Sequence, residues 1–278
     1  MSFTTCKILW GTQISSIIKA EVAASCRHLL SRKNIIPRLA VVQVGLREDS
    51  NIYIKNKQEA LKKVGILLRH IQLSEDVTLQ EIIRRIRILN EDDQIHAILV
   101  QLPLPEHLNT NIIFRSLSII KDVDGLHPMN VGLLSSGDLA ASVIPCAPAA
   151  CVELLRRYEI DVSYKHVVVV GRSNIVGRPL ASLLEKMNAT VTLCHSKTAY
   201  LPEFVKQADI LVAAMGKPEY IKAEWLKKGA VVMDVGVNIV TDTNKKSGRG
   251  IVGDVEFSKA KEVASAITPV PGGIGPAH

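Results

Sequence analysis

Aromatic side chains are scarce in this sequence, at 4% of its 278 residues, so its core must be built mainly from Ile, Leu, Val and Ala. No apolar run approaches the roughly 18–20 residues that a membrane-spanning helix needs, which argues against an integral membrane protein. Apolar residues still make up 47% of the chain and charged residues 22%. That balance is typical of a globular enzyme with one or two domains.

The five cysteines are odd in number and show no paired C-x-x-C spacing. We therefore expect no zinc site, and we interpret the cysteines as buried or free thiols of a reducing compartment. The first residues are poor in acids, as in a mitochondrial leader, yet residues 8–11 already resemble the start of folded structure. We expect a cytoplasmic protein without a cleavable leader.

The net charge of +7 raises the question of nucleic-acid binding. The basic residues are dispersed, however, and no basic stripe interleaved with aromatic residues is present. A diffuse positive field favours anionic small molecules, such as a phosphorylated dinucleotide or a polyglutamylated cofactor. A solvated surface that happens to be basic explains the charge equally well. We expect neither a nucleic-acid nor a membrane partner.

Apolar segments of strand length alternate with amphipathic helical segments, a pattern that predicts parallel sheets wrapped by helices. The expected strands are residues 39–44, 66–73, 97–102, 167–170, 190–194, 210–214 and 231–235. The expected helices are residues 53–64, 79–89, 148–158 and 177–187. The Pro/Gly-rich tail, residues 267–276, is not expected to form a long helix. The fold class is therefore α/β.

The loop from Gly171 to Gly177 follows a very apolar strand and opens a helix. Glycines allow the backbone to approach a pyrophosphate, and a helix N-terminus supplies free N–H donors to it. The spacing departs from the usual G-x-G-x-x-G, so a structural turn without a ligand remains an alternative. The order of strand, glycine loop, helix and strand is typical of a dinucleotide-binding domain.

The next strand indicates which dinucleotide is bound. In NAD sites that strand usually ends in an acid that bonds the ribose hydroxyl. Here it ends in His195-Ser-Lys-Thr198, with no carboxylate. Together with Arg172, these donors favour the 2′-phosphate of NADP over NAD.

Tyr53 and Lys57 are four residues apart, so on a helix they share one face. A phenol can orient a substrate, and a partly desolvated lysine can reach the pKa range of proton transfer. A solvated helix face is the alternative interpretation of this pair. Short-chain dehydrogenases also use Tyr-x-x-x-Lys, but there the pair follows the glycine loop, whereas here it precedes Gly171.

Other polar candidates stand where strands end. Gln101 ends one predicted strand, either as a satisfied edge residue or as a group that tunes Lys57. Asp122 and Asp124 belong to a predicted loop, where acids usually form turns. An aspartate there can equally bind the paired N–H donors of an amino-pyrimidine ring, such as that of a pterin.

These segments together resemble the bifunctional methylenetetrahydrofolate dehydrogenase/methenyltetrahydrofolate cyclohydrolase family, and they follow the family's order over nearly the whole chain. The matching pieces are Tyr53-Ile-Lys-Asn-Lys57 with Gly65-Ile66, Val100-Gln-Leu-Pro-Leu-Pro105, Lys121-Asp-Val-Asp-Gly-Leu-His-Pro128, Gly171-Arg-Ser-Asn-Ile-Val-Gly-Arg-Pro179, Cys194-His-Ser-Lys-Thr198, Asp234-Val-Gly236, Val252-Gly-Asp-Val255 and Thr268-Pro-Val-Pro-Gly-Gly-Ile-Gly-Pro276.

The resemblance implies NADP-dependent oxidation of 5,10-methylene-tetrahydrofolate and hydrolysis of the methenyl product to 10-formyl-tetrahydrofolate. It implies that Lys57 handles protons, Tyr53 orients the folate, Gln101 tunes Lys57 and Asp124 binds the pterin. The other expected substrate contacts are Leu102, Pro271, Gly272 and Gly273. The expected cofactor contacts are Gly171, Arg172, Ser173, Ile175, Gly177, His195, Ser196, Val237, Asn238 and Thr268.

The resemblance also implies two α/β domains flanking a cleft, the second of them Rossmann-like, and a homodimer. We expect a folate-binding domain over residues 1–148, joined by the tail 268–278, and an NADP-binding domain over residues 149–267. The family pattern continues into a terminal helix beyond the last residue of this sequence. The chain is therefore expected to be a fragment of a longer protein, such as one fused to a formate ligase, or a shortened form.

Two departures from the family pattern leave alternatives open. Ala147 and Ala150 replace a threonine and a glycine near the cofactor, which could weaken one activity. Trp10 replaces a small acid and is expected to be a surface change. The alternatives are an enzyme that retains only one activity, a non-catalytic folate- or NADP-binding dimerisation module, and a dehydrogenase for another substrate.

Overall fold

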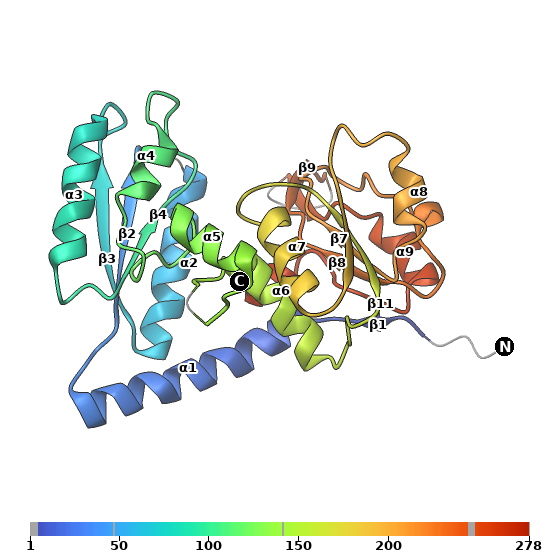
Figure 1. Cartoon of the computed structure of the whole chain (residues 1–278), viewed down its shortest axis with the longest axis horizontal. Helices are drawn as coiled ribbons and strands as arrows, with labels where there is room; N and C mark the ends of the chain where they lie inside the picture. The colour runs from blue at the N-terminus through green and yellow to red at the C-terminus, as the bar shows by residue number, and fades with distance from the viewer. Residues whose placement is uncertain (1–4, 47, 141, 244–247, 278) are drawn as a thin grey trace. The chain divides into compact units, whose positions relative to one another are not determined.

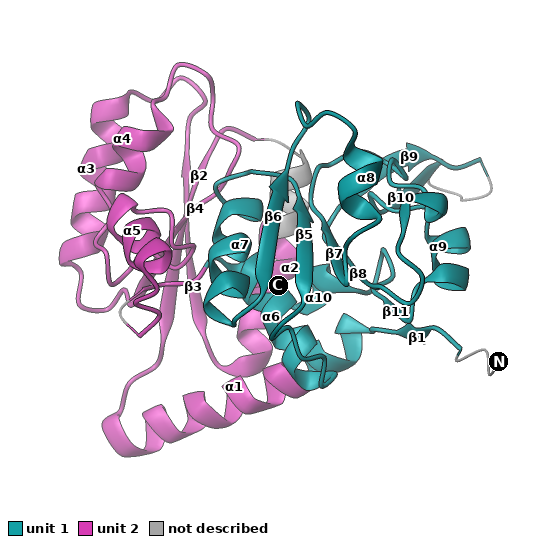
Figure 2. Ribbon diagram, turned by 45° about the vertical axis from the view of Figure 1, so that its right-hand side comes forward, with its two compact units in different colours: residues 1–16, 145–278 teal, residues 17–144 magenta. Residues whose placement is uncertain are grey.

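The chain forms two compact units, coloured separately in Figure 2. Unit 1 comprises residues 1–16 and 145–278, and unit 2 comprises residues 17–144. The computed structural model describes residues 5–46, 48–140, 142–243 and 248–277, without the side chains of residues 48–53. Each unit is built around its own parallel sheet.

Unit 2 contains a three-stranded parallel sheet in the order β3-β2-β4. Its strands are β2 (Arg38–Val44), β3 (Leu67–Leu73) and β4 (Ala97–Val100). Its helices are α1 (Gly11–Lys33), which begins in unit 1, α2 (Glu48–Val64), α3 (Leu79–Glu91), α4 (Thr110–Arg115) and α5 (Pro128–Ser136). Because each strand-to-strand connection carries a helix, the chain can return to pair its strands in parallel.

The two faces of this sheet are covered by different helices (Figure 1). On one face, Ala40 and Val42 of β2 pack against Ile82 and Ile86 of α3 and against α4. On the other face, the alternate residues of β2 pack against α2. Successive side chains of a strand point to opposite faces, so the nearly unbroken apolar run of β2 fits a strand that is buried on both sides.

Unit 1 contains a six-stranded sheet in the order β1-β11-β8-β7-β5-β6, parallel throughout its pairs. Its strands are β1 (Lys7–Ile8), β5 (His166–Val170), β6 (Thr190–Cys194), β7 (Ile210–Ala213), β8 (Val231–Asp234) and β11 (Ala266–Ile267). A separate antiparallel pair is formed by β9 (Asn238–Thr241) and β10 (Arg249–Val252). The confirmed class is α/β with a Rossmann-like second sheet.

Helices and one 3-10 turn surround this sheet. They are α6 (Cys146–Arg157), α7 (Gly177–Lys186), α8 (Leu201–Val205), η1 (Ala223–Trp225), α9 (Phe257–Val263) and α10 (Ile274–Ala277). Val168 and Val170 of β5 pack in one apolar cluster with α8 and α9. Because β5 and β7 adjoin in the centre and every residue of β7 is buried, the loops after these strands start from a rigid base.

The sequence prediction located the central strands to within one or two residues. It missed the hairpin of β9 and β10 and the two-residue strands β1 and β11, which lack an apolar run long enough to be recognised. In the structure the tail belongs to unit 1, because β11 pairs with β8 and Gly272 O accepts a hydrogen bond from Thr12 N (3.2 Å). The assignment of folate and cofactor domains to residue ranges stays a prediction.

Candidate active site

Helix α2 carries both members of the predicted Tyr53–Lys57 pair. The side chain of Tyr53 lies outside the described residues, whereas Lys57 is half-buried. Between them, Ile54 is 4% exposed and anchors the helix to the sheet of unit 2. The helical spacing of four residues therefore holds, and Lys57 stands one turn from a side chain fixed in the core.

Gln101 directly follows β4, and its backbone N–H donates to Val42 O at 2.9 Å. Its side-chain Nε2 donates to Leu102 O at 2.9 Å. Its Oε1 is buried and has no hydrogen-bond partner among the described residues. A buried carbonyl oxygen without a donor costs about 1–3 kcal/mol. Such an oxygen is available to accept a bond from an ammonium group or from a substrate N–H.

The two acids of the loop after α4 have different settings. Asp122 is 1% exposed, and its Oδ2 accepts bonds from His127 N–H (2.8 Å) and from Asn130 Nδ2 (2.8 Å). Asp122 therefore holds the loop to the start of α5. Asp124 is half-buried, two residues further along. The structure thus assigns the turn-forming role to Asp122 and leaves Asp124 as the candidate for binding.

Lys121 fixes the other end of this loop. Its ammonium group donates to three carbonyl oxygens at the end of α3: Leu89 O (3.2 Å), Asn90 O (2.7 Å) and Asp92 O (2.9 Å). Helix C-termini expose unpaired carbonyls and carry partial negative charge, so a cation is well placed there. Lys121 thus belongs to the scaffold of the loop.

One apolar cluster brings the three candidate segments together. Ile54 of α2, Leu99 of β4 and Val123 of the acidic loop pack in the same cluster. Each is a close chain neighbour of a candidate polar residue: Lys57, Gln101 and Asp124 respectively. The three segments that carry Lys57, Gln101 and Asp124 therefore meet on one side of the sheet of unit 2.

The glycine loop of unit 1 joins β5 to α7. A Cβ on Gly171 would lie 2.0 Å from Ala214 O, and one on Gly177 would lie 1.9 Å from Gly171 O. Both positions therefore require glycine because three backbone segments meet there. The φ of Gly171 is +133°, which also favours glycine. This packing places the start of the ten-residue helix α7 directly behind the loop.

The exposed part of this loop fits a dinucleotide. Arg172, Ser173 and Ile175 are exposed, and the N-terminus of α7 has no side-chain cap. The Ser173 hydroxyl accepts a bond from Val176 N–H at 3.2 Å, which shapes the turn. Loop residues at the carboxyl end of a parallel sheet, in front of a helix N-terminus, are where a pyrophosphate binds in this class of fold.

The turn after β6 contains the predicted 2′-phosphate donors. His195 N–H donates to Thr198 Oγ1 (2.9 Å), and His195 Nδ1 accepts from Lys197 N–H (3.1 Å). These bonds close a compact turn in which Ser196 and Lys197 are exposed. Because β6 adjoins β5, this turn follows the strand next to the glycine loop, where the adenosine ribose is held in such folds.

Two buried carboxylates that the sequence analysis left without a role stand beside these loops. Asp234 ends β8 and is 3% exposed, and Asp254 follows β10 and is fully buried. Burial raises the pKa of Asp234 to about 7, against the opposing effect of N–H bonds from Asp254 and Val255. The motifs Asp-Val-Gly and Gly-Asp-Val each pair an aspartate with a glycine, and this pairing was the available sequence signal. It does not reveal that the two motifs meet in the structure.

Three of the predicted cofactor contacts differ in where their side chains point. Val237 is 63% exposed after β8, as a ligand contact requires. Asn238 Nδ2 donates to Asp254 Oδ1 at 2.9 Å, and fully buried Thr268 accepts at its Oγ1 from Asp234 N–H at 2.7 Å. Both polar side chains are thus bonded within unit 1. Their direct contact with the cofactor stays a prediction.

The tail motif packs tightly against the N-terminal segment. A Cβ on Gly272 would lie 2.9 Å from the Trp10 ring, and one on Gly11 would lie 1.7 Å from Gly273 O. Trp10 is 42% exposed. The expectation of a surface position for Trp10 agrees with this exposure, and one side of its ring lies against Gly272 of the segment predicted to bind substrate.

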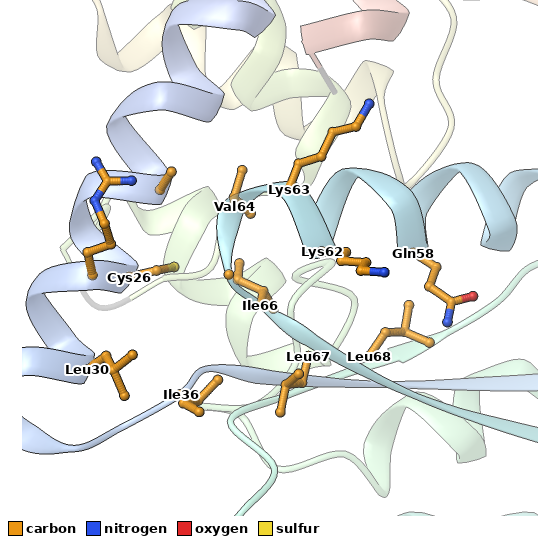
Figure 3. A pocket seen from close by; sticks show the side chains of 13 residues that line it. Cys26, Leu30, Ile36, Gln58, Lys62, Lys63, Val64, Ile66, Leu67 and Leu68 are labelled. Carbon is orange, nitrogen blue, oxygen red and sulfur yellow. The ribbon is translucent and has the colours of Figure 1, made fainter.

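A cavity of about 590 Å³ lies elsewhere in unit 2 (Figure 3). It lies between α1, the end of α2 and the start of β3, and apolar side chains such as Leu30, Ile66 and Leu68 line it with Lys62 and Lys63. None of the predicted site residues lines it. Within the described ranges there is no group of three or more potential metal ligands, and no helix long and apolar enough to cross a membrane.

Two family models match this chain. Residues 9–124 match the tetrahydrofolate dehydrogenase/cyclohydrolase catalytic domain. Residues 145–278 match the tetrahydrofolate dehydrogenase/cyclohydrolase NAD(P)-binding domain. The second match coincides with unit 1 from its residue 145 onward.

Curated relatives agree with this assignment. The chain is 46% identical to bifunctional protein FolD 2 of Arabidopsis thaliana, over 98% of this chain and 91% of that protein. It is 48% identical to the cytoplasmic C-1-tetrahydrofolate synthase of Homo sapiens, over 97% of this chain but only 29% of that protein.

Solved structures agree as well. The bifunctional FolD of Campylobacter jejuni has 42% identity and a TM-score of 0.93, over 98% of this chain and 94% of that one. FolD of Trypanosoma brucei, solved with NADP cofactor and an inhibitor, has 37% identity and a TM-score of 0.93, over 98% and 93%. With both domain models matched in order, the chain belongs to the tetrahydrofolate dehydrogenase/cyclohydrolase family.

Proposed function

We propose that this chain oxidises 5,10-methylene-tetrahydrofolate with NADP and hydrolyses the methenyl product to 10-formyl-tetrahydrofolate. The observation that carries the proposal is the unpaired, buried Oε1 of Gln101 in the unit that also gathers Lys57 and Asp124 around one apolar cluster. A scaffold domain gains nothing from leaving this oxygen without a donor. A site that binds an ammonium group or a substrate N–H does gain from such an oxygen, because the oxygen can accept their hydrogen bond.

In the oxidation step, positioning does most of the work. When bound, NADP accepts a hydride at C4 of its nicotinamide from the methylene bridge of the folate. The residues of unit 1 hold the dinucleotide: the loop from Gly171 to Gly177 and the N-terminus of α7 receive the pyrophosphate. Asp124 binds the pterin, and Tyr53 orients it.

In the hydrolysis step, a water molecule attacks the cationic methenyl carbon and loses a proton. The C–N5 bond then breaks, N5 takes up a proton, and the formyl group stays on N10. This step needs a group that accepts and returns protons. Lys57 performs that role, and the unpaired Oε1 of Gln101 is the acceptor that would orient its ammonium group once substrate is bound.

The preference for NADP rests on the turn from His195 to Thr198. It contains no carboxylate to bond a ribose 2′-hydroxyl, and it exposes Ser196 and Lys197 beside the glycine loop. Arg172 is exposed on the neighbouring loop. These groups form charge-assisted bonds with a 2′-phosphate. Replacing Arg172 with Ala should raise the KM for NADP and leave the KM for NAD nearly unchanged.

The proposal is tested by following methenyl absorbance after methylene-tetrahydrofolate and NADP are mixed with the wild-type chain. We expect absorbance to rise with NADP and to decay as the product is hydrolysed. Supplying methenyl-tetrahydrofolate without NADP should give the decay alone. A chain that shows neither change would refute the proposed function.

A second candidate, loss of one activity, is favoured by Ala150. This residue is 2% exposed in α6, so its methyl group occupies core volume where the family pattern has glycine. The same assay decides between the candidates, because formation and decay are measured separately. Formation reduced to background with normal decay would identify a cyclohydrolase alone.

We also propose a homodimer that forms through unit 1. The hairpin of β9 and β10 exposes Ile239 (68%) and Ile251 (42%), next to exposed Val237 (63%). Exposed apolar groups of this kind favour burial against a second copy. Sedimentation velocity should show a dimer, and Ile239→Lys should shift it toward monomer; an unchanged monomer in both would refute this arrangement.

The chain spans about 29% of the length of the C-1-tetrahydrofolate synthases that it matches. Relatives are named as cytoplasmic, mitochondrial or chloroplastic. We propose a cytoplasmic location, supported by cysteines that are free in the structure. Fractionation of the natural source would test it.

A further inference from the structure

The loops after β7 and β8, which adjoin in the sheet of unit 1, and the loop after β10 of the separate hairpin meet at two buried carboxylates. Asp234 ends β8, residues 214–217 follow β7, and Asp254 follows β10. In an open parallel sheet, ligands bind at the carboxyl ends of the strands, where such loops lie. The geometry of these loops therefore bears directly on cofactor binding.

The Asp254 carboxylate is saturated by N–H donors. Its Oδ2 accepts from Met215 N (2.7 Å) and Gly216 N (3.0 Å), and its Oδ1 accepts from Lys217 N (2.8 Å) and Asn238 Nδ2 (2.9 Å). Three consecutive backbone amides thus point at one side chain. The two oxygens of a carboxylate provide all four acceptor sites, whereas an amide side chain replaces one acceptor with a donor.

Asp234 fixes Asp254 in turn. Its Oδ1 accepts from Asp254 N (3.0 Å) and Gly236 N (3.0 Å), and its Oδ2 accepts from Val255 N (2.9 Å). The two glycines make room for the two acids reciprocally. A Cβ on Gly236 would lie 2.3 Å from the Asp254 carboxyl group, and one on Gly253 would lie 2.0 Å from Asp234 Oδ2. The motifs Asp-Val-Gly and Gly-Asp-Val therefore interlock.

The loop that Asp254 holds also supports the glycine loop. Ala214 comes directly before the three bonded amides, and its carbonyl oxygen is the atom that excludes a Cβ from Gly171. Ala214 N–H donates to Val170 O at 2.8 Å. A shift of residues 214–217 would therefore change the backbone surface against which Gly171 is packed.

We propose that Asp254 is a positioning residue for the dinucleotide: it forms the loop of residues 214–217 in advance and thereby supports the glycine loop that binds the cofactor. The proposal rests on the proposed dehydrogenase function. Asp254 itself is fully buried, so it acts through the loop that it holds. Its contribution is to cofactor affinity, because a preformed loop loses less conformational entropy on binding.

The test is the Asp254→Asn variant. Asn keeps the size of the side chain but faces two of the four N–H donors with another donor. We expect the Kd for NADPH, measured by calorimetry, and the KM for NADP to rise about tenfold or more, as the loss of one or two hydrogen bonds implies. Hydrolysis of supplied methenyl-tetrahydrofolate should stay near the wild-type rate, because the residues proposed for that step, Lys57 and Gln101, belong to unit 2.

Asp209→Asn is the matched control. Asp209 precedes β7 at the opposite end of the same strand, and its carboxylate also accepts a backbone bond, from His166 N (2.9 Å). We expect this control to leave the Kd for NADPH unchanged. An unchanged Kd in Asp254→Asn with hydrolysis intact would overturn the proposal, as would an equal rise in both variants. A wild-type chain that binds NADPH without oxidising folate would instead contradict the proposed function alone.

Hydrogen exchange decides the question if Asp254→Asn does not fold. In the wild-type chain without cofactor, the amides of residues 215–217 should exchange slowly although Gly216 and Lys217 are exposed. Fast exchange that slows only after NADPH is added would show that the cofactor orders the loop, and would overturn the proposal.

Discussion

In unit 2 the buried carboxylate of Asp122 accepts bonds from His127 N–H and Asn130 Nδ2, whereas in unit 1 two buried carboxylates, Asp234 and Asp254, share one network of N–H donors. Asp122 thus ties one loop to one helix. The unit 1 pair ties together the loops that follow three strands. In both units, an acid inside a family motif forms part of the scaffold, next to residues that are predicted to bind the ligand.

The difference lies in how each unit tolerates buried negative charge. Asp122 shares its setting with a neutral amide and lies within the loop that Lys121 anchors to α3. Asp234 instead has Asp254 as a neighbour, which adds to the effect of burial in raising its pKa. Unit 1 should therefore be the more pH-sensitive unit, and unit 2 the one that suffers most from loss of a single carboxylate.

The largest expected effect concerns the different roles of Asp122 and Asp124, tested by replacing each with alanine. Asp122→Ala removes the acceptor of His127 N–H and one of the two acceptors of the buried Asn130 Nδ2, which keeps its bond to Ile119 O, and should cost about 1–3 kcal/mol of unfolding free energy. Asp124→Ala should cost little stability but should raise the KM for folate about tenfold or more. Urea denaturation and steady-state kinetics on both variants check this contrast. The same pattern in both variants would show that the two roles are not divided as proposed.

The second-largest expected effect is on the pH dependence of the free energy of unfolding. The pKa of Asp234 is about 7 in the folded chain and near 3.8 in the unfolded chain. Between these pH values the carboxyl group is therefore protonated in the folded chain and ionised in the unfolded one. The contribution of Asp234 to the free energy of unfolding should therefore be greatest below the unfolded pKa. It should fall as pH rises toward 7, by at most about 1.4 kcal/mol per pH unit. Asp234→Asn should flatten that part of the stability profile.

Denaturation midpoints measured from about pH 2 to pH 8 on both proteins check this. Glu81 provides an internal contrast, because hydrogen bonds from Arg84 and Arg85 lower its pKa to about 2. The stability that ionised Glu81 contributes is lost as pH falls through the folded pKa of Glu81, the opposite direction to the effect of Asp234. Equal slopes for wild type and Asp234→Asn would mean that Asp234 titrates normally.

The smallest effect should come from Glu81→Gln. The ion pairs of Glu81 with Arg84 and Arg85 lie on the exposed side of α3. Exposed pairs of this kind contribute little because water and salt screen them. Thermal unfolding at neutral pH should show no resolvable change, and a large one would mean that surface charge matters more here than the buried carboxylates.

Much of the fold was predictable from the sequence, for local reasons. The central strands β2, β5 and β7 are apolar runs of strand length, and the glycine loop after β5 has a required backbone geometry. The hairpin of β9 and β10 was missed because its strands are short, half-exposed and carry no strong turn signal.

The candidate site was predictable only in part. The roles of Lys57, Gln101 and Asp124 came from the family resemblance and stay predictions, whereas the sequence did not show that Asp122 holds the loop to α5. Nor did the sequence show that Asp254 meets residues 215–217, since that contact spans nearly forty residues of chain. Such pairings depend on how strands are ordered in the sheet, which no local pattern encodes.

The most direct test of the account is the fate of methenyl-tetrahydrofolate in Lys57→Met, with Lys55→Met as control. Both lysines belong to α2, but Lys55 is exposed and Lys57 half-buried. The account predicts that Lys57→Met abolishes decay of methenyl absorbance, whereas Lys55→Met decays like wild type. Decay at the wild-type rate in Lys57→Met would contradict the assignment of proton transfer to Lys57.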